Sequence, residues 1–416
     1  MAHTGRRVVS EMVVDTLNLQ ALSSAADDGR DGLVEFCRRL IQTRSPSGEE
    51  GEAAKLVAAQ MRSLGYDDVW TDAVGNVVGV IRGSGGGRSL MLNTHLDHVD
   101  AGDERGWPFP PFDGRIHDGC VWGRGAMDIK GPTAAQVRGA ALLKTLGVQP
   151  EGDVYVAAAV QEEVGGLGSV ELAKTTPTDR AVVGEATNNE LRRGHRGRIE
   201  LIVRIEGRSC HASMPKRGVN PHYTLASFLA GLRDIDLVEH PFLGCETQAP
   251  TLLFTDQTSS NVVPGEIRLH IDWRTVPQRS PEAVRDAVQA VLDSALAEGA
   301  TGVAEVKAER LTTYTGEKRE VPSLFPSFVL EEDDHLLLEA RTALDAVLGR
   351  ETPVRRWEFA TDGGHLTVAG VPCIGFGPGD ETLAHTNQER VSIEQLVEAA
   401  RGYAALAVDL TRPSSR

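Results

Sequence analysis

The sequence predicts an α/β protein in which a doubly wound, mostly parallel sheet carries the chemistry and a smaller block is inserted. Four short hydrophobic runs lead toward side chains of types that bind metal ions, at residues 89–93, 154–160, 181–183 and 372–376. Short apolar runs rich in branched residues are typical of buried strands in a parallel sheet. Open α/β sheets place their functional groups beyond the carboxyl ends of such strands. Acidic and imidazole side chains at that edge therefore predict a hydrolytic metal site.

Length and composition favour a two-domain globular protein. The chain has 416 residues, more than one typical domain, and 41% of them are hydrophobic. No apolar run approaches the roughly 20 residues of a membrane span, and the N-terminal stretch does not resemble a secretory signal. The formal net charge of −16 argues against nucleic acid or an anionic membrane as a partner. The five cysteines include no C-x-x-C pair, which indicates a reducing cytoplasm rather than a disulfide framework.

The elements of the larger domain follow one another in a regular order. Residues before about Asp31 look like a loose or peripheral arm. Two amphipathic helices follow, separated at residues 45–48, and residues 69–81 indicate a hairpin. Strands, loops and helices then alternate over residues 89–185, as in a doubly wound sheet. The same pattern returns later, with a helix near 334–348, a strand from 372 and a closing helix from about 393.

A compact block of different character interrupts this domain. It has the order strand, helix, strand, strand, helix, strand, at residues 198–205, 221–232, 251–254, 266–273, 281–296 and 302–306. This βαββαβ order predicts a ferredoxin-like split unit. Pro281 stands at the start of its second helix, where proline is favoured. We therefore expect a discontinuous catalytic domain of residues 1–195 and 311–416, with residues 196–310 inserted as a second domain.

Two segments carry candidate ligands that are ambiguous when taken alone. His95 and Asp97 are two residues apart, so an extended segment points both side chains the same way. His95 can bind zinc and Asp97 can orient it, although an isolated His-x-Asp pair is common by chance. Asp128 lies in the glycine-rich stretch 123–131, where glycines allow backbone to pack close to a site. Its two oxygens could bridge two metal ions, or it could cap a helix in a surface loop.

Three more carboxylates and a histidine follow predicted strands. Glu162 and Glu163 come directly after an apolar strand, where adjacent carboxylates repel each other and lose solvation unless cations compensate. Because they point in opposite directions, one can bind metal while the other faces the substrate as general base. Glu185 could merely cap a helical turn, and His385 could be an ordinary loop histidine. Coincidence explains the whole set poorly, since every member follows a predicted strand.

Taken together, these residues resemble a known family. It comprises the zinc-dependent amidohydrolases and exopeptidases that include aminoacylase, carboxypeptidase G, acetylornithine deacetylase and succinyl-diaminopimelate desuccinylase. The resemblance runs from about Gly32 to the C-terminus, and its blocks are residues 95–97, 123–131, 161–163, 184–187, 207–213 and His385. It implies that the inserted block, from about Arg196 to about Arg310, is a lid and dimerisation domain, and therefore that the protein is a homodimer.

The resemblance also implies a metal centre with two zinc ions, for which cobalt or manganese could substitute. The implied ligands are His95, Asp128, Glu163, Glu185 and His385. Asp128 would bridge the two ions. His95 and Glu185 would complete the coordination of one ion, and Glu163 and His385 that of the other. Glu162 would be the general base, and Asp97 would support His95.

A catalytic role is implied for His211, and substrate-binding roles are implied at four further positions. His211 matches the family's histidine that reaches an active site, often that of the partner subunit, to stabilise the oxyanion. Asn261 and Arg274 match positions that hold the substrate's carboxylate, although they could be a turn residue and a strand-surface charge. Gly363 and Gly364 lie in a segment that matches a substrate-facing loop.

The implied reaction is hydrolysis of the amide bond in a small N-acyl amino acid or a related carboxylate-bearing amide. A glutamate at position 185, where some relatives have aspartate, is similar to deacylases and carboxypeptidases. Within enzymes, the alternative is a dipeptidase or carboxypeptidase-type exopeptidase, or a hydrolase of cyclic amides. From another class, a non-catalytic ligand-binding homologue would be expected to lack the base or a ligand, and the sequence retains all of them.

Overall fold

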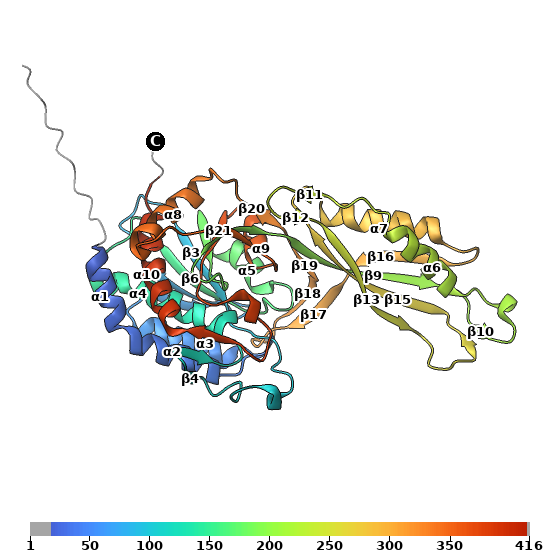
Figure 1. The fold of residues 1–416 in the computed structure, drawn as a ribbon, viewed down its shortest axis with the longest axis horizontal. Helices are drawn as coiled ribbons and strands as arrows, with labels where there is room; N and C mark the ends of the chain where they lie inside the picture. The colour runs from blue at the N-terminus through green and yellow to red at the C-terminus, as the bar shows by residue number, and fades with distance from the viewer. Residues whose placement is uncertain (1–17, 414–416) are drawn as a thin grey trace, which may run out of the picture.

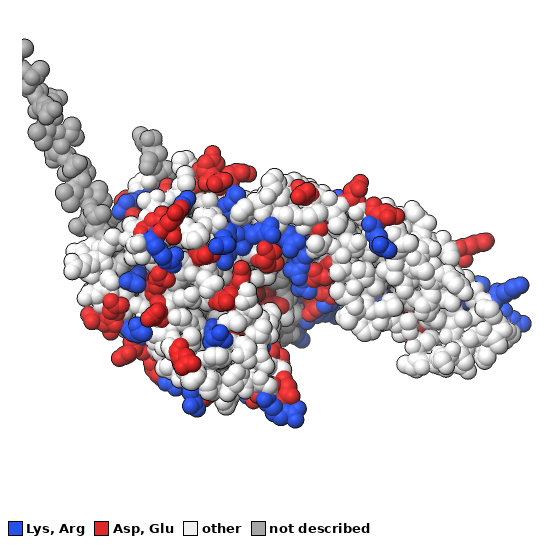
Figure 2. All heavy atoms as spheres, in the orientation of Figure 1, with Lys and Arg blue, Asp and Glu red and all other residues white. Residues whose placement is uncertain are grey.

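The computed structural model describes residues 18–413 and shows an elongated molecule made of two parts (Figure 1). Over these residues, the larger part has a nine-stranded sheet. Along the sheet its strands are β1 (Asp68–Thr71), β2 (Val77–Ile81), β6 (Val154–Ala159), β3 (Leu90–His95), β7 (Arg180–Val183), β22 (Cys373–Gly375), β8 (Leu191–His195) and β20 (Phe328–Val329), with β21 (Val354–Trp357) also paired to β8. Charged side chains crowd the visible face of this part, whereas the second part is mostly uncharged in the same view (Figure 2).

The centre of the sheet is parallel, as the hydrophobic runs predict. β3 runs parallel to β6 and β7, and β22 runs parallel to β7. β1 and β2 form the expected antiparallel hairpin at one edge, where β2 is antiparallel to β6. Toward the other edge β8 is antiparallel to β22 and β20, so the sheet as a whole is mixed. All six residues of β3 are buried. The carboxyl ends of three neighbouring strands therefore meet at one edge.

Helices cover both faces of the sheet, which confirms the doubly wound class. Leu90 and Leu92 of β3 pack into a core formed with the long helices on one face, whereas Met91 packs into a second core on the opposite face. The first face carries α2 (Arg30–Gln42), α3 (Gly51–Ser63), α4 (Gly131–Leu146), α8 (His335–Leu348) and α10 (Ile393–Asp409), and the second carries α5 (Leu167–Thr175) and α9 (Gly363–Val368). Within the described residues, no helix is long and apolar enough to cross a membrane.

The prediction of a loose arm before about Asp31 is wrong for residues 19–28. Residues Leu19–Asp28 form helix α1, whose Asn18 cap accepts hydrogen bonds from two backbone N–H groups of the first turn. Leu22 and Ala26, four residues apart, bury one face of α1 in the main core. The buried face of α1 is narrow because the segment consists largely of alanine, serine and aspartate. Few large apolar residues therefore recur at helical spacing, and the sequence predicts this helix only weakly. The rest of the expected arm, residues 1–17, lies outside the described residues.

The inserted block has the predicted βαββαβ order, which is confirmed. Its elements are β9 (Gly197–Glu206), α6 (Pro221–Leu232), β13 (Thr247–Thr255), β15 (Glu266–Thr275), α7 (Pro281–Ala295) and β16 (Thr301–Val306). The strands pair antiparallel in the order β13-β15-β9-β16. Alternate residues of β9, such as Leu201 and Val203, pack under the two helices in a core separate from that of the larger part. The domain boundaries at 195/196 and 310/311 stay a prediction.

A hairpin after the inserted block reaches back to the larger part. It consists of β17 (Ala308–Thr312) and β18 (Lys318–Pro322), and β19 (Leu324–Phe325) then pairs with β9. The Tyr314 hydroxyl at its turn donates a hydrogen bond to the Gly75 carbonyl at 2.8 Å. The Gln161 side chain donates to the Thr312 carbonyl at 3.0 Å. The hairpin therefore contacts the segment that carries Glu162 and Glu163.

Candidate metal centre

Most of the candidate ligands converge because they lie at or just beyond the carboxyl ends of strands in the parallel sheet centre. His95 is the last residue of β3, and its Cα partner in β6 is Ala159, so Glu162 and Glu163 begin just beyond the same edge. Glu185 follows β7, the other neighbour of β3. Two loops complete the cluster. One brings Asp128, in the short irregular helical segment η2 (Ala126–Lys130), and the other brings His385 after β22.

Asp128 lies between two groups of side chains. Its Oδ1 is 3.2 Å from Nε2 of His95, and its Oδ2 is 3.2 Å from Nε2 of His385. Glu185 Oε1 lies 3.4 Å from the same nitrogen of His95. Glu163 Oε2 lies 3.3 Å from that of His385. The structure thus brings together all five predicted ligands, in two groups that share the Asp128 carboxylate.

The chemistry of these atoms fits divalent cations. Nε2 of His95 is buried and makes no hydrogen bond, and the same holds for Oε1 of Glu163. Two overlapping sets have ligand atoms within 4.8 Å of one another, namely His95–Glu162–Glu185 and His95–Asp128–Glu163. An unpaired buried polar atom is costly unless a ligand satisfies it. Imidazole and carboxylate groups suit zinc and other first-row divalent ions.

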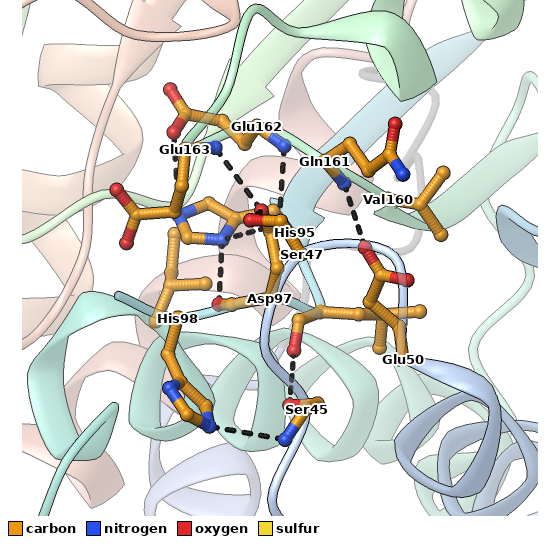
Figure 3. A network of polar contacts seen from close by, with 12 residues as sticks. Ser45, Ser47, Glu50, His95, Asp97, His98, Val160, Gln161, Glu162 and Glu163 are labelled. Atoms are coloured by element: carbon orange, nitrogen blue, oxygen red, sulfur yellow. Dashed lines mark hydrogen bonds and ion pairs between the residues drawn. The ribbon is translucent and has the colours of Figure 1, made fainter. Parts of the chain in front are cut away.

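Asp97 organises the centre from behind (Figure 3). It is fully buried, and its Oδ1 accepts a hydrogen bond from the Glu162 backbone N–H at 3.1 Å. Its Oδ2 accepts from the Glu163 N–H at 3.2 Å and from the Ser47 hydroxyl at 2.7 Å. Oδ1 also lies 3.4 Å from Nδ1 of His95. One carboxylate therefore fixes both the histidine ring and the loop that carries the two glutamates.

Glu162 lies beside the cluster rather than at its centre. Its Oε2 is 4.0 Å from Nε2 of His95, farther than the oxygens of Asp128 and Glu185. Burial raises the pKa of Glu162 well above its ordinary value, and the charges of neighbouring carboxylates add to this effect. A carboxylate with a raised pKa at the wall of a cavity has the property that a general base or acid needs near neutral pH.

The charges of the remaining groups depend on one another. Burial alone would lower the pKa of His95, but the carboxylates of Asp128, Asp97 and Glu185 raise it well above its ordinary value. Asp128 and Glu163 raise the pKa of His385 to about 10. The acidic neighbours thus favour the protonated forms of both imidazoles in the metal-free chain. Cations that bind here would displace these protons.

Two buried glutamates support the centre and were missed as site residues. Glu50 precedes α3, and its Oε1 accepts hydrogen bonds from the N–H groups of Gly48 and Gln161. Glu389 accepts from the N–H groups of Met127 and Asp128 and forms an ion pair with Arg124 at 2.6 Å. Nothing local in the sequence marks Glu389, because its partners lie about 260 residues away.

A cavity of about 500 Å³ opens in front of the cluster. Its walls come from both parts of the molecule and comprise Asp128, Glu162, Glu163, Glu185, Arg198, Arg274, Phe325, Phe359, Ala360, Glu381, Ala384 and His385. The larger part supplies the carboxylates and His385, whereas β9, β15 and β19 supply two arginines and a phenylalanine. The structure places Arg274 in this cavity, and Arg198 is a lining residue that the sequence did not single out.

The predicted catalytic residue His211 and three of the predicted substrate-binding residues lie outside the cavity wall. His211 in β10 (Cys210–His211) and Asn261 beside β14 (Val262–Val263) are exposed, at the end of the inserted block farthest from the sheet (Figure 1). Gly363 and Gly364 are buried, and a Cβ on Gly364 would lie 2.0 Å from the Pro326 carbonyl oxygen. The contacts of these four residues with substrate stay predictions.

Comparisons with known proteins give the family. The model of peptidase family M20/M25/M40 matches residues 91–409. A protein of Escherichia coli K12 named uncharacterized protein YgeY is 30% identical over 388 residues, which cover 92% of this chain and 95% of the relative. Succinyl-diaminopimelate desuccinylase of Paracoccus denitrificans is 29% identical over 390 residues, 89% of this chain and 96% of that enzyme. The crystal structure of aminopeptidase PepT from Bacillus cereus has a TM-score of 0.72 at 19% identity, covering 92% and 99% of the two chains.

These matches confirm the family resemblance and the hydrolase class that the sequence predicts. The family match spans most of the chain, including every candidate ligand. The fold likeness to the aminopeptidase extends over both the sheet and the inserted block. The chain is thus a metal-dependent amidohydrolase or peptidase, and it belongs to peptidase family M20/M25/M40.

Proposed function

We propose that the protein is a deacylase that hydrolyses the amide bond of a small N-acyl amino acid or a related carboxylate-bearing amide. The observation that carries this proposal is the composition of the cavity. It combines a two-part acidic cluster, a buried glutamate beside that cluster and an arginine on the opposite wall. A guanidinium is suited to a carboxylate, which it can bind through two parallel hydrogen bonds. The volume of about 500 Å³ matches a small molecule.

Two zinc ions are the proposed cofactor, with cobalt or manganese as substitutes. Their proposed ligands are His95, Asp128, Glu163, Glu185 and His385. When bound, such ions lower the pKa of water and polarise a carbonyl oxygen. The proximity of one Asp128 oxygen to each histidine supports a bridging role for this residue.

The chain's own groups divide the remaining work. Glu162 takes a proton from the attacking water and later passes it to the leaving amine, for which its raised pKa is suited. Asp97 holds the loop of Glu162 in place through a backbone hydrogen bond. Arg274 anchors a substrate carboxylate. Arg274 is itself positioned by Asp272, whose Oδ1 accepts from its Nε at 2.7 Å.

A dipeptidase or carboxypeptidase activity is the second candidate, because a dipeptide also presents an amide and a carboxylate. A screen of N-acyl amino acids against dipeptides separates the two, with zinc, cobalt and manganese each supplied. We expect turnover of N-acyl amino acids at the higher kcat/KM. Faster hydrolysis of dipeptides would replace the deacylase by an exopeptidase. Absence of hydrolysis in both sets, with metal shown to be bound, would reject the proposal.

We further propose a cytoplasmic homodimer that forms through the inserted block. β13 is an edge strand of its sheet, and Leu252, Leu253 and Phe254 are 52%, 50% and 50% exposed. An apolar unpaired edge favours association with a second strand. This arrangement would also give His211 a role, since His211 lies far from the cavity of its own chain.

Light scattering and subunit mixing test the dimer. We expect twice the chain mass for the parent and a single chain mass for Phe254→Asp, with an unchanged circular dichroism spectrum. Mixing His211→Ala with Glu162→Gln should restore part of the activity, because mixed dimers would contain one complete site. No recovery in mixed dimers shown to form would place His211 outside the partner's site.

A further inference from the structure

A row of three residues on neighbouring strands faces the acidic cluster. In the antiparallel register, Arg274 of β15 lies opposite Arg198 of β9, and Phe325 of β19 lies opposite Arg198 on its other side. Directly opposed residues of antiparallel strands project to the same face of the sheet, with Cα atoms about 4.5–5.5 Å apart. All three residues line the cavity. The two guanidinium groups are therefore neighbours in the same wall.

The two arginines share one carboxylate. Asp272 Oδ2 accepts from Nε of Arg198 at 2.8 Å, and Asp272 Oδ1 accepts from Nε of Arg274 at 2.7 Å. Within the described part of the chain, the Nη1 atoms of both arginines make no hydrogen bond. The side chains keep 35% and 29% of their surface exposed. Asp272 thus holds both guanidinium groups through Nε, and the Nη1 atom of each arginine remains available to a ligand.

The acidic side chains near the two arginines have other cationic partners. Glu200 is next to this row, but its oxygens lie 2.8 Å from Nδ1 of His270 and 3.1 Å from Nζ of Lys307, against 3.9 Å from Arg198. Glu381 also lines the cavity, and its Oε1 lies 3.5 Å from Nη2 of the buried Arg192. Counted with Asp272, the two guanidinium groups carry one net positive charge. A substrate carboxylate held by Arg274 would balance this charge, and a second carboxylate would have Nη1 of Arg198 as its hydrogen-bond donor.

We infer that Arg198 is a specificity-determining residue and that the substrate carries two carboxylates, one held by Arg274 and the other by Arg198. This inference rests on the deacylase proposal and names its substrate class, an N-acyl amino acid with a second acidic group on the acyl or the amino-acid side. A single carboxylate shared by both arginines would use the same residues. The two arrangements differ in one respect, because only the first makes Arg198 selective for the second charge.

Binding measured without turnover tests the inference separately from the reaction. The full-length Glu162→Gln protein, loaded with zinc, is titrated by calorimetry with two matched pairs of probes. N-acetylglutamate and N-acetylglutamine differ by one charge on the amino-acid side. N-succinylalanine and N-succinamylalanine differ by one charge on the acyl side. In at least one pair we expect the doubly charged ligand to bind roughly ten- to a hundred-fold more tightly, the range typical of a charge-assisted hydrogen bond.

Arg198→Gln in this background should abolish the preference and leave the affinity for the singly charged ligand nearly unchanged. Arg198→Lys keeps the charge but lacks the planar guanidinium, so it should retain part of the preference for the doubly charged ligand. Arg268→Gln is the matched control, because Arg268 is a registered partner of Arg204 on the same sheet and does not line the cavity. Equal weakening of singly and doubly charged ligands by Arg198→Gln, or no preference in either pair, would overturn the inference. Failure of the parent to hydrolyse N-acyl amino acids would instead reject the proposed reaction.

Discussion

Replacing Asp97 by asparagine should weaken the metal centre without removing any proposed ligand. Asp97 accepts from three donors, and its carboxylate oxygens are fully buried. Asparagine keeps one oxygen, so its NH₂ group must face at least one backbone N–H. If it replaces Oδ1, the Glu162 N–H loses its acceptor while the Glu163 N–H and the Ser47 hydroxyl keep theirs. A buried donor left without a partner costs about 1–3 kcal/mol, which is the expected loss in free energy of unfolding.

The same substitution should lower zinc affinity about 10- to 100-fold, the usual effect of removing a group that orients a ligand histidine. Competition with a chromophoric chelator measures the affinity, and urea denaturation of the metal-free protein measures stability. Ser47→Ala is the matched control, because it removes one donor and leaves both backbone N–H groups paired, so its effect should be smaller. Zinc affinity equal to that of the parent would refute the role assigned to Asp97, even if activity fell.

Three further predictions concern the cluster and its surroundings. Glu162→Gln should lower kcat about 10²- to 10⁴-fold while elemental analysis finds zinc near the parental content, and retained turnover would remove Glu162 from the mechanism. His95→Ala should lower the zinc content itself, so full occupancy would contradict its assignment as a ligand. Burial raises the pKa of Glu50 to about 7, from 4.5. Because the folded chain then binds this proton more tightly than the unfolded chain, the stability that Glu50 contributes is complete below about pH 4.5 and is lost as the pH rises through 7. The free energy of unfolding of zinc-free Glu50→Gln, measured by denaturant titration, should therefore rise relative to that of the zinc-free parent by roughly 2–4 kcal/mol between pH 5 and pH 8. A difference that does not change with pH would show that the folded chain does not favour the protonated form of Glu50.

The order of elements could be predicted from the sequence because each segment carries a local signal. The alternation in β9 and the proline at the start of α7 identify members of the inserted block without reference to the rest of the chain. The apolar runs that became β3, β6 and β7 are buried on both faces, so their hydrophobic character is continuous and easily recognised. Helix α1 escaped prediction because only Leu22 and Ala26 contribute buried contacts.

The residues of the site also fall into those that the sequence could predict and those that it could not. Residues at or just beyond the end of a strand, such as His95 and Glu185, could be proposed from sequence, because parallel strands bring their carboxyl ends together wherever they pair. Residues whose partners are distant in the chain could not. Glu389 and Arg198 carry no local pattern that distinguishes them from surface charges, and only the packed chain places one behind Asp128 and the other in the cavity wall.

The sequence by itself determined which segments become strands and helices and which side-chain types follow them, since hydrophobic periodicity and turn residues act over a few positions. Only the tertiary structure decided that Asp128 lies between the two histidines, that Asp97 supports both glutamates, and that two arginines face them across one cavity. The physical reason is that hydrogen bonds and charge interactions depend on distances of a few ångströms between residues far apart in the chain. Those distances are fixed only when the sheet and the inserted block have packed.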